Sequence, residues 1–113
     1  MMLSINENNF KKLVLESPYP VLVHFWAPWC GLCRLIQPNL LKFQAQWEGQ
    51  VHIVGVNADD NFRLANTYRL HNLPTLILFD GGVPVQRIEG MTSRDELQKL
   101  LNNFAINSVV RSA

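Results

Sequence analysis

Residues 21–33 read VLVHFWAPWCGLC, and this stretch decides the fold. The part Val21–Trp26 is apolar except for His24, a pattern typical of a central strand covered on both faces. After a short turn, a helical spacing of apolar residues begins at Cys30. We therefore expect a buried strand that ends just before a helix, with Cys30 and Cys33 in the first turn of that helix.

The placement of the two cysteines at a helix start has chemical consequences. Unpaired backbone N–H groups and the positive end of the helix dipole both favour a thiolate over a thiol at this point. Cys30, at the tip, is expected to be the attacking nucleophile. Cys33 lies one turn inside, shielded but within reach of Cys30, so it is expected to resolve the mixed disulfide with a substrate.

The rest of the sequence predicts a sheet around this strand and helix. The expected elements are an edge strand over 3–5, a helix over 7–16 capped by Asn6, the strand over 21–26, a helix from Cys30 to near Gly49 kinked at Pro38, a strand over 51–56, a helix over 62–68, strands over 75–79 and 83–89, and a helix ending at Phe104. The turn signal Asp80-Gly81-Gly82 makes the last two strands an antiparallel hairpin. Parallel crossovers followed by a hairpin indicate an α/β fold. We expect three α/β/α layers, with a central mixed sheet of four to five strands and four helices.

The last helix is expected to begin with a capping box, Ser93-Arg94-Asp95-Glu96. Three of its leucines are expected to face inward: Leu97, Leu100 and Leu101. One domain is therefore predicted over residues 1–105, with a C-terminal tail over 106–113.

Composition excludes several classes of function. A length of 113 residues fits one domain, and 48% hydrophobic with 17% charged residues is typical of a globular chain. A formal net charge of +1 without a basic stripe predicts no nucleic-acid binding. The N-terminus lacks a basic leader and the longest apolar run is Leu76–Phe79, so we expect neither a secretory signal nor a membrane span. We expect a cytoplasmic monomer, and in that reducing compartment the cysteine pair is catalytic or metal-binding rather than a structural staple.

Further residues stand at informative spacings along the chain. They are FWAPWCG-x-C over 25–33, Pro38, Asp59, LPT over 73–75, and Gly90. Together these anchors resemble the thioredoxin family from about Leu3 to Phe104. The resemblance implies the thioredoxin fold and a protein-disulfide oxidoreductase whose redox-active disulfide is Cys30-Cys33, with no cofactor. It also implies a cis peptide bond before Pro74 and a substrate groove. The expected substrate-binding residues are Trp29, Gly31, Leu32, Leu73, Pro74, Gly90 and Met91, with Asp59 as a loop cap or rim contact.

Leu32 departs from the family pattern, which usually has proline between the glycine and the second cysteine. Leucine restores a backbone N–H that proline lacks, beside the Cys30 sulfur. We therefore predict a more acidic Cys30 thiol and a less reducing disulfide than in the usual family member.

A second departure lies under the dithiol. The family usually places a buried Asp and a partner Lys where this chain has His24 and Gly55. The joint loss of both charges is electrostatically consistent, because one charge left alone would be costly to bury. His24 is therefore a candidate proton acceptor for Cys33. The alternative is a core histidine bonded to backbone or to trapped water. Together, Leu32 and His24 resemble atypical thioredoxins such as the C-type.

Three functions remain open from the sequence. The leading one is disulfide reduction or exchange on a narrow range of protein partners, recharged by a separate thioredoxin reductase or another dithiol donor. The second is a redox-linked binding module with little general reductase activity. The third is a metal or cluster carrier that bridges two chains through Cys30 and Cys33.

Overall fold

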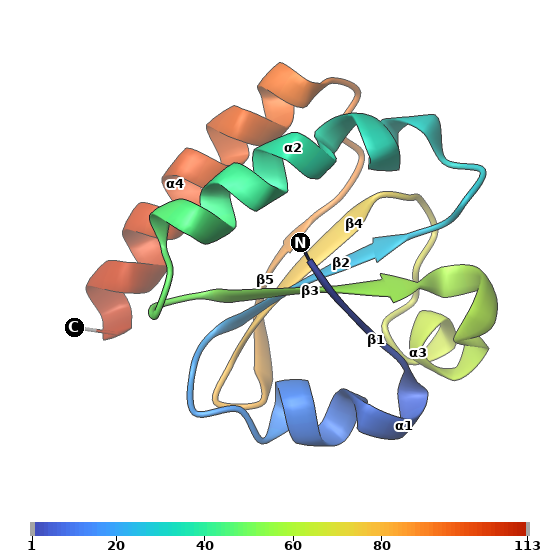
Figure 1. Cartoon of the computed structure of the whole chain (residues 1–113), viewed down its shortest axis with the longest axis horizontal. Coiled ribbons are helices and arrows are strands. Elements are labelled where there is room, and N and C mark those ends of the chain that lie inside the picture. Colours follow the sequence, from blue (N-terminus) through green and yellow to red (C-terminus); the bar gives the residue numbers. More distant parts are fainter. Residues whose placement is uncertain (1, 113) are drawn as a thin grey trace.

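The computed structural model describes the backbone of residues 2–112 and the side chains of residues 2–103. At its centre lies a mixed sheet of five strands in the order β1-β3-β2-β4-β5 (Figure 1). The strands are β1 (Leu3–Ile5), β2 (Val21–Trp26), β3 (His52–Asn57), β4 (Thr75–Asp80) and β5 (Val83–Ile88). Strands β1, β3 and β2 are parallel, and β4 runs antiparallel to both β2 and β5. The predicted mixed sheet, its edge strand and its hairpin are confirmed.

Helices cover both faces of the sheet, as expected (Figure 1). They are α1 (Glu7–Phe10), the π-helical turn η1 (Lys11–Leu15), α2 (Gly31–Gln46), the 3-10 turn η2 (Ala58–Asp60), α3 (Phe62–Thr67) and α4 (Arg94–Ser112). Helices α2 and α4 share one core cluster, and α1 and α3 share another. In the part of the chain that the structure describes, no helix is long and apolar enough to cross a membrane.

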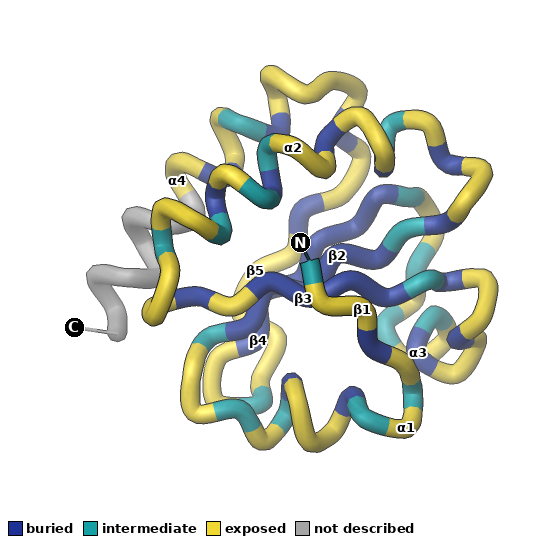
Figure 2. Tube along the Cα trace, in the orientation of Figure 1, coloured by how far each residue is buried: buried dark blue, intermediate teal, exposed yellow. Residues whose placement is uncertain are grey.

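The alternation of side chains along β2 divides the core between these two faces. Leu22 joins the cluster of α2 and α4, whereas Val23 and Phe25 join the cluster of α1 and α3. Figure 2 shows β2 buried along most of its length, which agrees with a central strand. By the same alternation, His24 lies on the α2 side of the sheet.

The first helix differs from its predicted form. Asn6 caps it as expected, because its side-chain oxygen accepts from the backbone N–H of Asn8 at 2.8 Å. The chain then widens into η1, where the N–H of Glu16 donates to the carbonyl of Lys11, five residues back, at 2.9 Å. The helix predicted over 7–16 is therefore present, but its second half is π-helical rather than α-helical.

The β4–β5 hairpin turns at Gly81 and Gly82, whose φ angles are 62° and 81°. Two successive positive φ angles make a turn that favours glycine and matches the twist of the strands. A Cβ on Gly82 would lie 2.6 Å from the carbonyl oxygen of Leu15, whereas a Cβ on Gly81 would have open space. Gly82 thus lets the hairpin tip approach η1 closely.

Helix α4 differs from the prediction in three respects. The Ser93 hydroxyl accepts from the backbone N–H of Glu96 at 3.1 Å, but the Glu96 carboxylate accepts from Thr92 rather than from Ser93. Leu100 is 36% exposed, so its inward orientation is wrong. The other two leucines, Leu97 and Leu101, lie one turn apart and are fully buried.

The third difference is the length of α4, which continues to Ser112 beyond the predicted end at Phe104. The side chains of the predicted tail, from Ile106 onward, lie outside the described residues.

Candidate functional site

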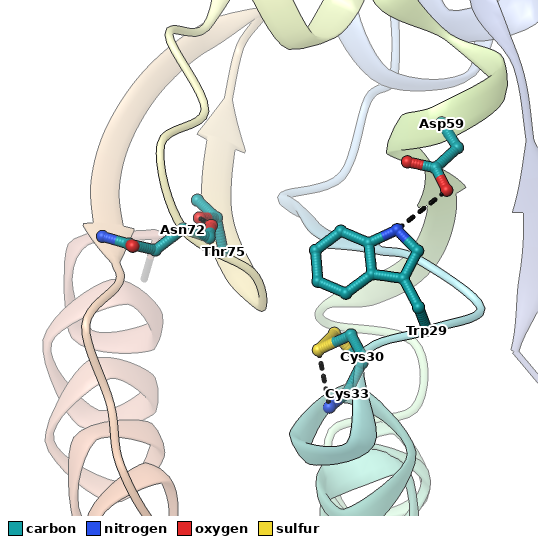
Figure 3. Close-up of a disulfide and its surroundings, with 6 residues drawn as sticks. All are labelled: Trp29, Cys30, Cys33, Asp59, Asn72 and Thr75. Carbon is teal, nitrogen blue, oxygen red and sulfur yellow. Dashed lines mark hydrogen bonds between the residues drawn. A yellow bond between two sulfur atoms is a disulfide. The ribbon is translucent and has the colours of Figure 1, made fainter.

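The two cysteines lie at the start of α2, just after the turn that follows β2 (Figure 3). Cys30 is the N-cap of α2, with extended backbone, and its Sγ accepts a hydrogen bond from the N–H of Cys33 at 3.2 Å. The two sulfurs form a disulfide, and the Cα atoms are 5.3 Å apart. The Cys30 sulfur thus occupies the place of a capping oxygen, where a helix offers unpaired N–H groups to a negative charge.

The described hydrogen bond to the Cys30 sulfur comes from the backbone of α2. In this disulfide state its donor is the N–H of Cys33, and the expected effect of the Leu32 N–H on the Cys30 thiol stays a prediction. The side chain of Leu32 is half-buried and packs against the cluster formed by Ala27, Cys30 and Cys33. A role for the Leu32 N–H would therefore belong to the reduced state.

The exposures of the two cysteines differ less than expected. Cys30 is 6% exposed and Cys33 is 2% exposed, so both are buried and Cys30 is the more accessible of the two. The neighbouring Trp29 is 68% exposed, which makes it a surface residue rather than a packing residue. A partner that reaches the dithiol would therefore meet the indole as well.

The orientation of Trp29 depends on a turn from a different part of the chain. Its indole Nε1–H donates to Oδ2 of Asp59 at 3.0 Å (Figure 3). Asp59 lies in η2, which is capped by the side chain of Asn57 accepting from the Asp59 N–H at 3.0 Å. Asp59 therefore acts as a contact of the site rim, which was one of its two expected roles.

The Leu73-Pro74 peptide bond is cis, as the resemblance implied. Leu73 is half-buried and packs against the cluster that contains both cysteines, and Pro74 is buried. The loop is tied at its base by the Thr75 hydroxyl, which donates to the carbonyl of Asn72 at 2.6 Å (Figure 3). The structure therefore brings Leu73 to the dithiol from a segment far away in sequence.

The remaining groove residues are not all at the surface of the site. Gly31 is exposed at the start of α2, and Gly90 is exposed with a φ of 73°. Met91 is only 6% exposed and packs in the core cluster that holds Leu97 and Leu101. The expectation that Met91 is an exposed contact residue rather than a core residue is therefore wrong, and a contact between substrate and this position stays a prediction.

His24 is buried without a visible partner for one ring nitrogen. The residue is 2% exposed, and Nε2 has no hydrogen-bond partner among residues 2–103. Burial lowers the pKa of His24 to about 4, so the imidazole is neutral at pH 7. At Nε2 the core alternative is therefore left with trapped water as the partner, and a role in proton transfer stays a prediction.

A pocket joins His24 to Cys33, and sequence reasoning missed it. Its lining includes both residues together with Arg34 and Gln37 of α2. The only signal in the sequence was helical spacing, since Cys33 and Gln37 are four residues apart and share one helix face. Within the described residues there is no group of three or more His, Cys, Asp or Glu side chains that could hold a metal ion.

Comparisons with known proteins agree with this geometry. The family model described as Thioredoxin matches residues 1–103. Thioredoxin 1 of Nostoc sp. is 40% identical over 97 residues, which are 86% of this chain and 91% of that protein. The thioredoxin of Synechocystis sp. is 39% identical over 100 residues, which are 88% of this chain and 94% of that protein. Thioredoxin M4, chloroplastic, of Arabidopsis thaliana is 36% identical over 103 residues, which are 91% of this chain and 53% of that protein.

Proposed function

The chain belongs to the thioredoxin family and is a protein-disulfide oxidoreductase, and from this premise we propose that Cys30 attacks the substrate disulfide and Cys33 resolves the product. The observation that carries this assignment is the N-cap position of Cys30, whose sulfur accepts the N–H of Cys33 at 3.2 Å. A negative charge on that sulfur is stabilised by the helix start. Cys33 lies one turn further into the helix and is 2% exposed, against 6% for Cys30.

The exchange proceeds in two balanced steps. The Cys30 thiolate attacks one sulfur of a substrate disulfide, forms a mixed disulfide and releases the other substrate sulfur as a thiolate. Cys33 then loses its proton and attacks the Cys30 sulfur, which releases the second substrate sulfur. The substrate has gained two electrons, and the chain holds the Cys30–Cys33 disulfide seen here. A separate thioredoxin reductase or another dithiol donor supplies two electrons to restore the dithiol.

A trapping experiment tests the assignment of the two cysteines. The Cys33→Ser variant should accumulate a mixed disulfide with a protein substrate such as insulin, because nothing resolves the bond at Cys30. The Cys30→Ser variant is the matched control and should trap nothing. Trapping through Cys33 instead would overturn the assignment. If both the native chain and the trap variant stayed at background with insulin and dithiothreitol, the chain would be a binding module rather than a reductase.

We propose that Leu32 makes the disulfide less reducing than in a relative with proline at this position. Leu32 is the second residue of α2, where its N–H has no partner one turn back and is free to face a thiolate in the reduced chain. Such an extra donor stabilises the dithiol state. The surroundings of the dithiol, with 6% exposure at Cys30, also favour a narrow range of protein partners.

We propose that His24 carries the Cys33 proton only in transit. Both residues line one pocket, which supports a path between them. A pKa of about 4 lies roughly 4.5 units below that of an ordinary thiol, so leaving the proton on His24 would cost about 6 kcal/mol. The proton must therefore pass on to solvent as Cys33 attacks. A His24→Leu variant with an unchanged pH profile of exchange would contradict the path.

We propose a cytoplasmic monomer as the working form. Both cysteines of the chain belong to the redox pair, which is typical of a protein in a reducing compartment and leaves none for a structural disulfide. Light scattering of the purified chain tests the monomeric state. Fractionation of the cells that make the protein tests the cytoplasmic location. A stable dimer would contradict the proposed monomer, and recovery from an organelle would contradict the proposed location.

A further inference from the structure

A pocket of about 330 Å³ reaches the dithiol from the Cys33 side. Cys33 is part of its wall, whereas Cys30 and Trp29 are not. The other walls come from β1, from the end of β2 with the following turn, from β3 and from the first turns of α2. A volume of this size lies at the lower end of the range for small-molecule sites. The pocket is therefore separate from the exposed indole that flanks the disulfide.

One polar group in this pocket is buried without a partner. His24 lines the pocket, and its Nε2 has no hydrogen-bond partner among residues 2–103. The residue is 2% exposed, so bulk water does not supply that partner. Buried polar side-chain atoms are nearly always hydrogen-bonded to protein or to ordered water, so a polar group that enters the pocket is a candidate partner for this imidazole. The lining of the pocket thus includes a buried polar side chain as well as apolar ones.

The absence of a side chain at position 55 shapes the pocket. Gly55 pairs in register with His24 on one side and with Ser4 on the other. A Cβ at Gly55 would lie 3.3 Å from Trp26 Nε1 and 3.4 Å from Met2 Sδ. The glycine therefore allows the indole and the methionine to lie over β3, where they form an apolar wall.

The pocket carries a positive charge, from Arg34. Among residues 2–103, Arg34 is the only charged side chain in its lining, since His24 is neutral at pH 7 and none of the lining residues described there carries a carboxylate. Gln37 and the indole N–H of Trp26 add further donors. Apolar walls with cationic and N–H donors suit a flat organic anion, because a planar guanidinium pairs well with a carboxylate.

We propose that this pocket binds a small aromatic carboxylate and that its occupancy is coupled to the redox state of Cys33. The carboxylate meets Arg34, and the ring lies against Trp26 and Pro28, with His24 in the same lining. Since Cys33 is part of the wall, a change between its disulfide and thiol forms alters the surroundings of the ligand. Any difference in affinity between these states must shift the redox equilibrium by the same factor. Binding itself is independent of the proposed exchange reaction, whereas the coupling rests on it.

The test uses 2-naphthoate as the probe and 2-naphthylmethanol as its uncharged counterpart, with the full-length chain. Amide chemical shifts in NMR titrations locate the site, and tryptophan fluorescence gives the affinity. We expect saturable binding of the carboxylate with shifts at Ser4, Gln37 and Gly55, and binding of the alcohol about tenfold weaker. We also expect the affinities of the oxidised and reduced chains to differ.

Two variants and one control make the assignment specific. Arg34→Gln should weaken the carboxylate about tenfold and leave the alcohol unchanged. Ser4→Trp, at an exposed β1 position that lines the pocket, should fill it and abolish binding of both probes. Lys42→Gln, which removes a cation from the same helix outside the pocket, should change nothing. Circular dichroism of each variant verifies the fold.

The outcomes separate the parts of the proposal. Absence of saturable binding, equal affinity for both probes, or shifts away from the pocket would overturn the site. Equal affinity of the oxidised and reduced chains would overturn the coupling alone. Failure of the chain to reduce insulin, with carboxylate binding intact, would reject the proposed exchange function and leave the pocket standing.

Discussion

Trp29 and Asp59 are 30 positions apart in sequence, yet the indole Nε1–H donates to the Asp59 carboxylate at 3.0 Å (Figure 3). The bond links the exposed ring beside the disulfide to the turn that follows β3. The ring therefore has a set orientation although it is 68% exposed. A partner protein meets an indole that is already positioned, which reduces the conformational entropy lost on binding.

Removal of this acceptor should slow exchange without unfolding the chain. Asp59→Ala frees the indole, and the loss of one hydrogen bond of about 1 kcal/mol should lower kcat/KM for insulin reduction about fivefold. Asp59→Asn keeps an acceptor oxygen and is the matched control, with a smaller expected loss. Equal losses in the two variants would show that the carboxylate acts by charge and not by orienting Trp29.

Proline at position 32 should make the disulfide more reducing. Leu32→Pro removes the N–H expected to stabilise the thiolate, and a change on the order of 30 mV in the potential corresponds to about 1.4 kcal/mol. Leu32→Ala keeps the N–H and separates the backbone effect from that of the side chain. Equilibration with glutathione measures both potentials. A potential of Leu32→Pro at or above that of the native chain would contradict the prediction.

His24 should make the free energy of unfolding depend on pH between about 4 and 6.5. Its pKa is lowered to about 4 by burial, so in this window the unfolded chain binds the proton and the folded chain does not. Stability should therefore fall as the pH falls, by about 3 kcal/mol in total from this group. Urea unfolding at several pH values measures the slope.

Two substitutions attribute that slope to His24. His24→Leu should flatten it, because the titrating group is gone. His52→Gln removes an exposed histidine that stacks on Tyr19 and should leave the slope in place. A slope that survives His24→Leu would assign the pH dependence to other groups.

Met91 should behave as a core residue and not as a binding residue. Met91→Ala should lower the free energy of unfolding by about 2–4 kcal/mol, because the side chain is 6% exposed within the core cluster. Leu100→Ala, at a position that is 36% exposed, should cost about 1 kcal/mol or less. If Met91→Ala were as stable as the native chain and had a raised KM for its protein substrate, Met91 would be a substrate contact instead.

The hairpin turn supplies a matched pair of glycines. Gly81→Ala should cost about 1 kcal/mol, since only the positive φ opposes a side chain there. Gly82→Ala should cost at least 2 kcal/mol more, on the order of a buried clash, because its Cβ would press on the Leu15 carbonyl at 2.6 Å. Thermal unfolding of both variants compares them directly, and equal losses would exclude the contact with η1.

Local patterns were enough to predict most elements of the fold. The unbroken apolar run of β2, the cap at Asn6 and the double glycine at Gly81 act over a few neighbouring residues, so their effects can be read along the chain. The start of α2 at the cysteine pair could likewise be predicted from neighbouring residues. The prediction missed the change of helix geometry in η1, and the end of the last helix failed because nothing local stopped α4.

The sequence alone determined the order of strands and helices and the placement of two thiols at a helix start, because hydrophobic period and capping are local properties. Only the tertiary structure decided that Asp59 holds Trp29, that Met91 is buried, and that His24 lines a pocket while its Nε2 has no partner among residues 2–103. Each of these depends on which distant segments pack together and on how closely they fit. Packing acts through contacts in space, and no pattern along the chain specifies those contacts residue by residue.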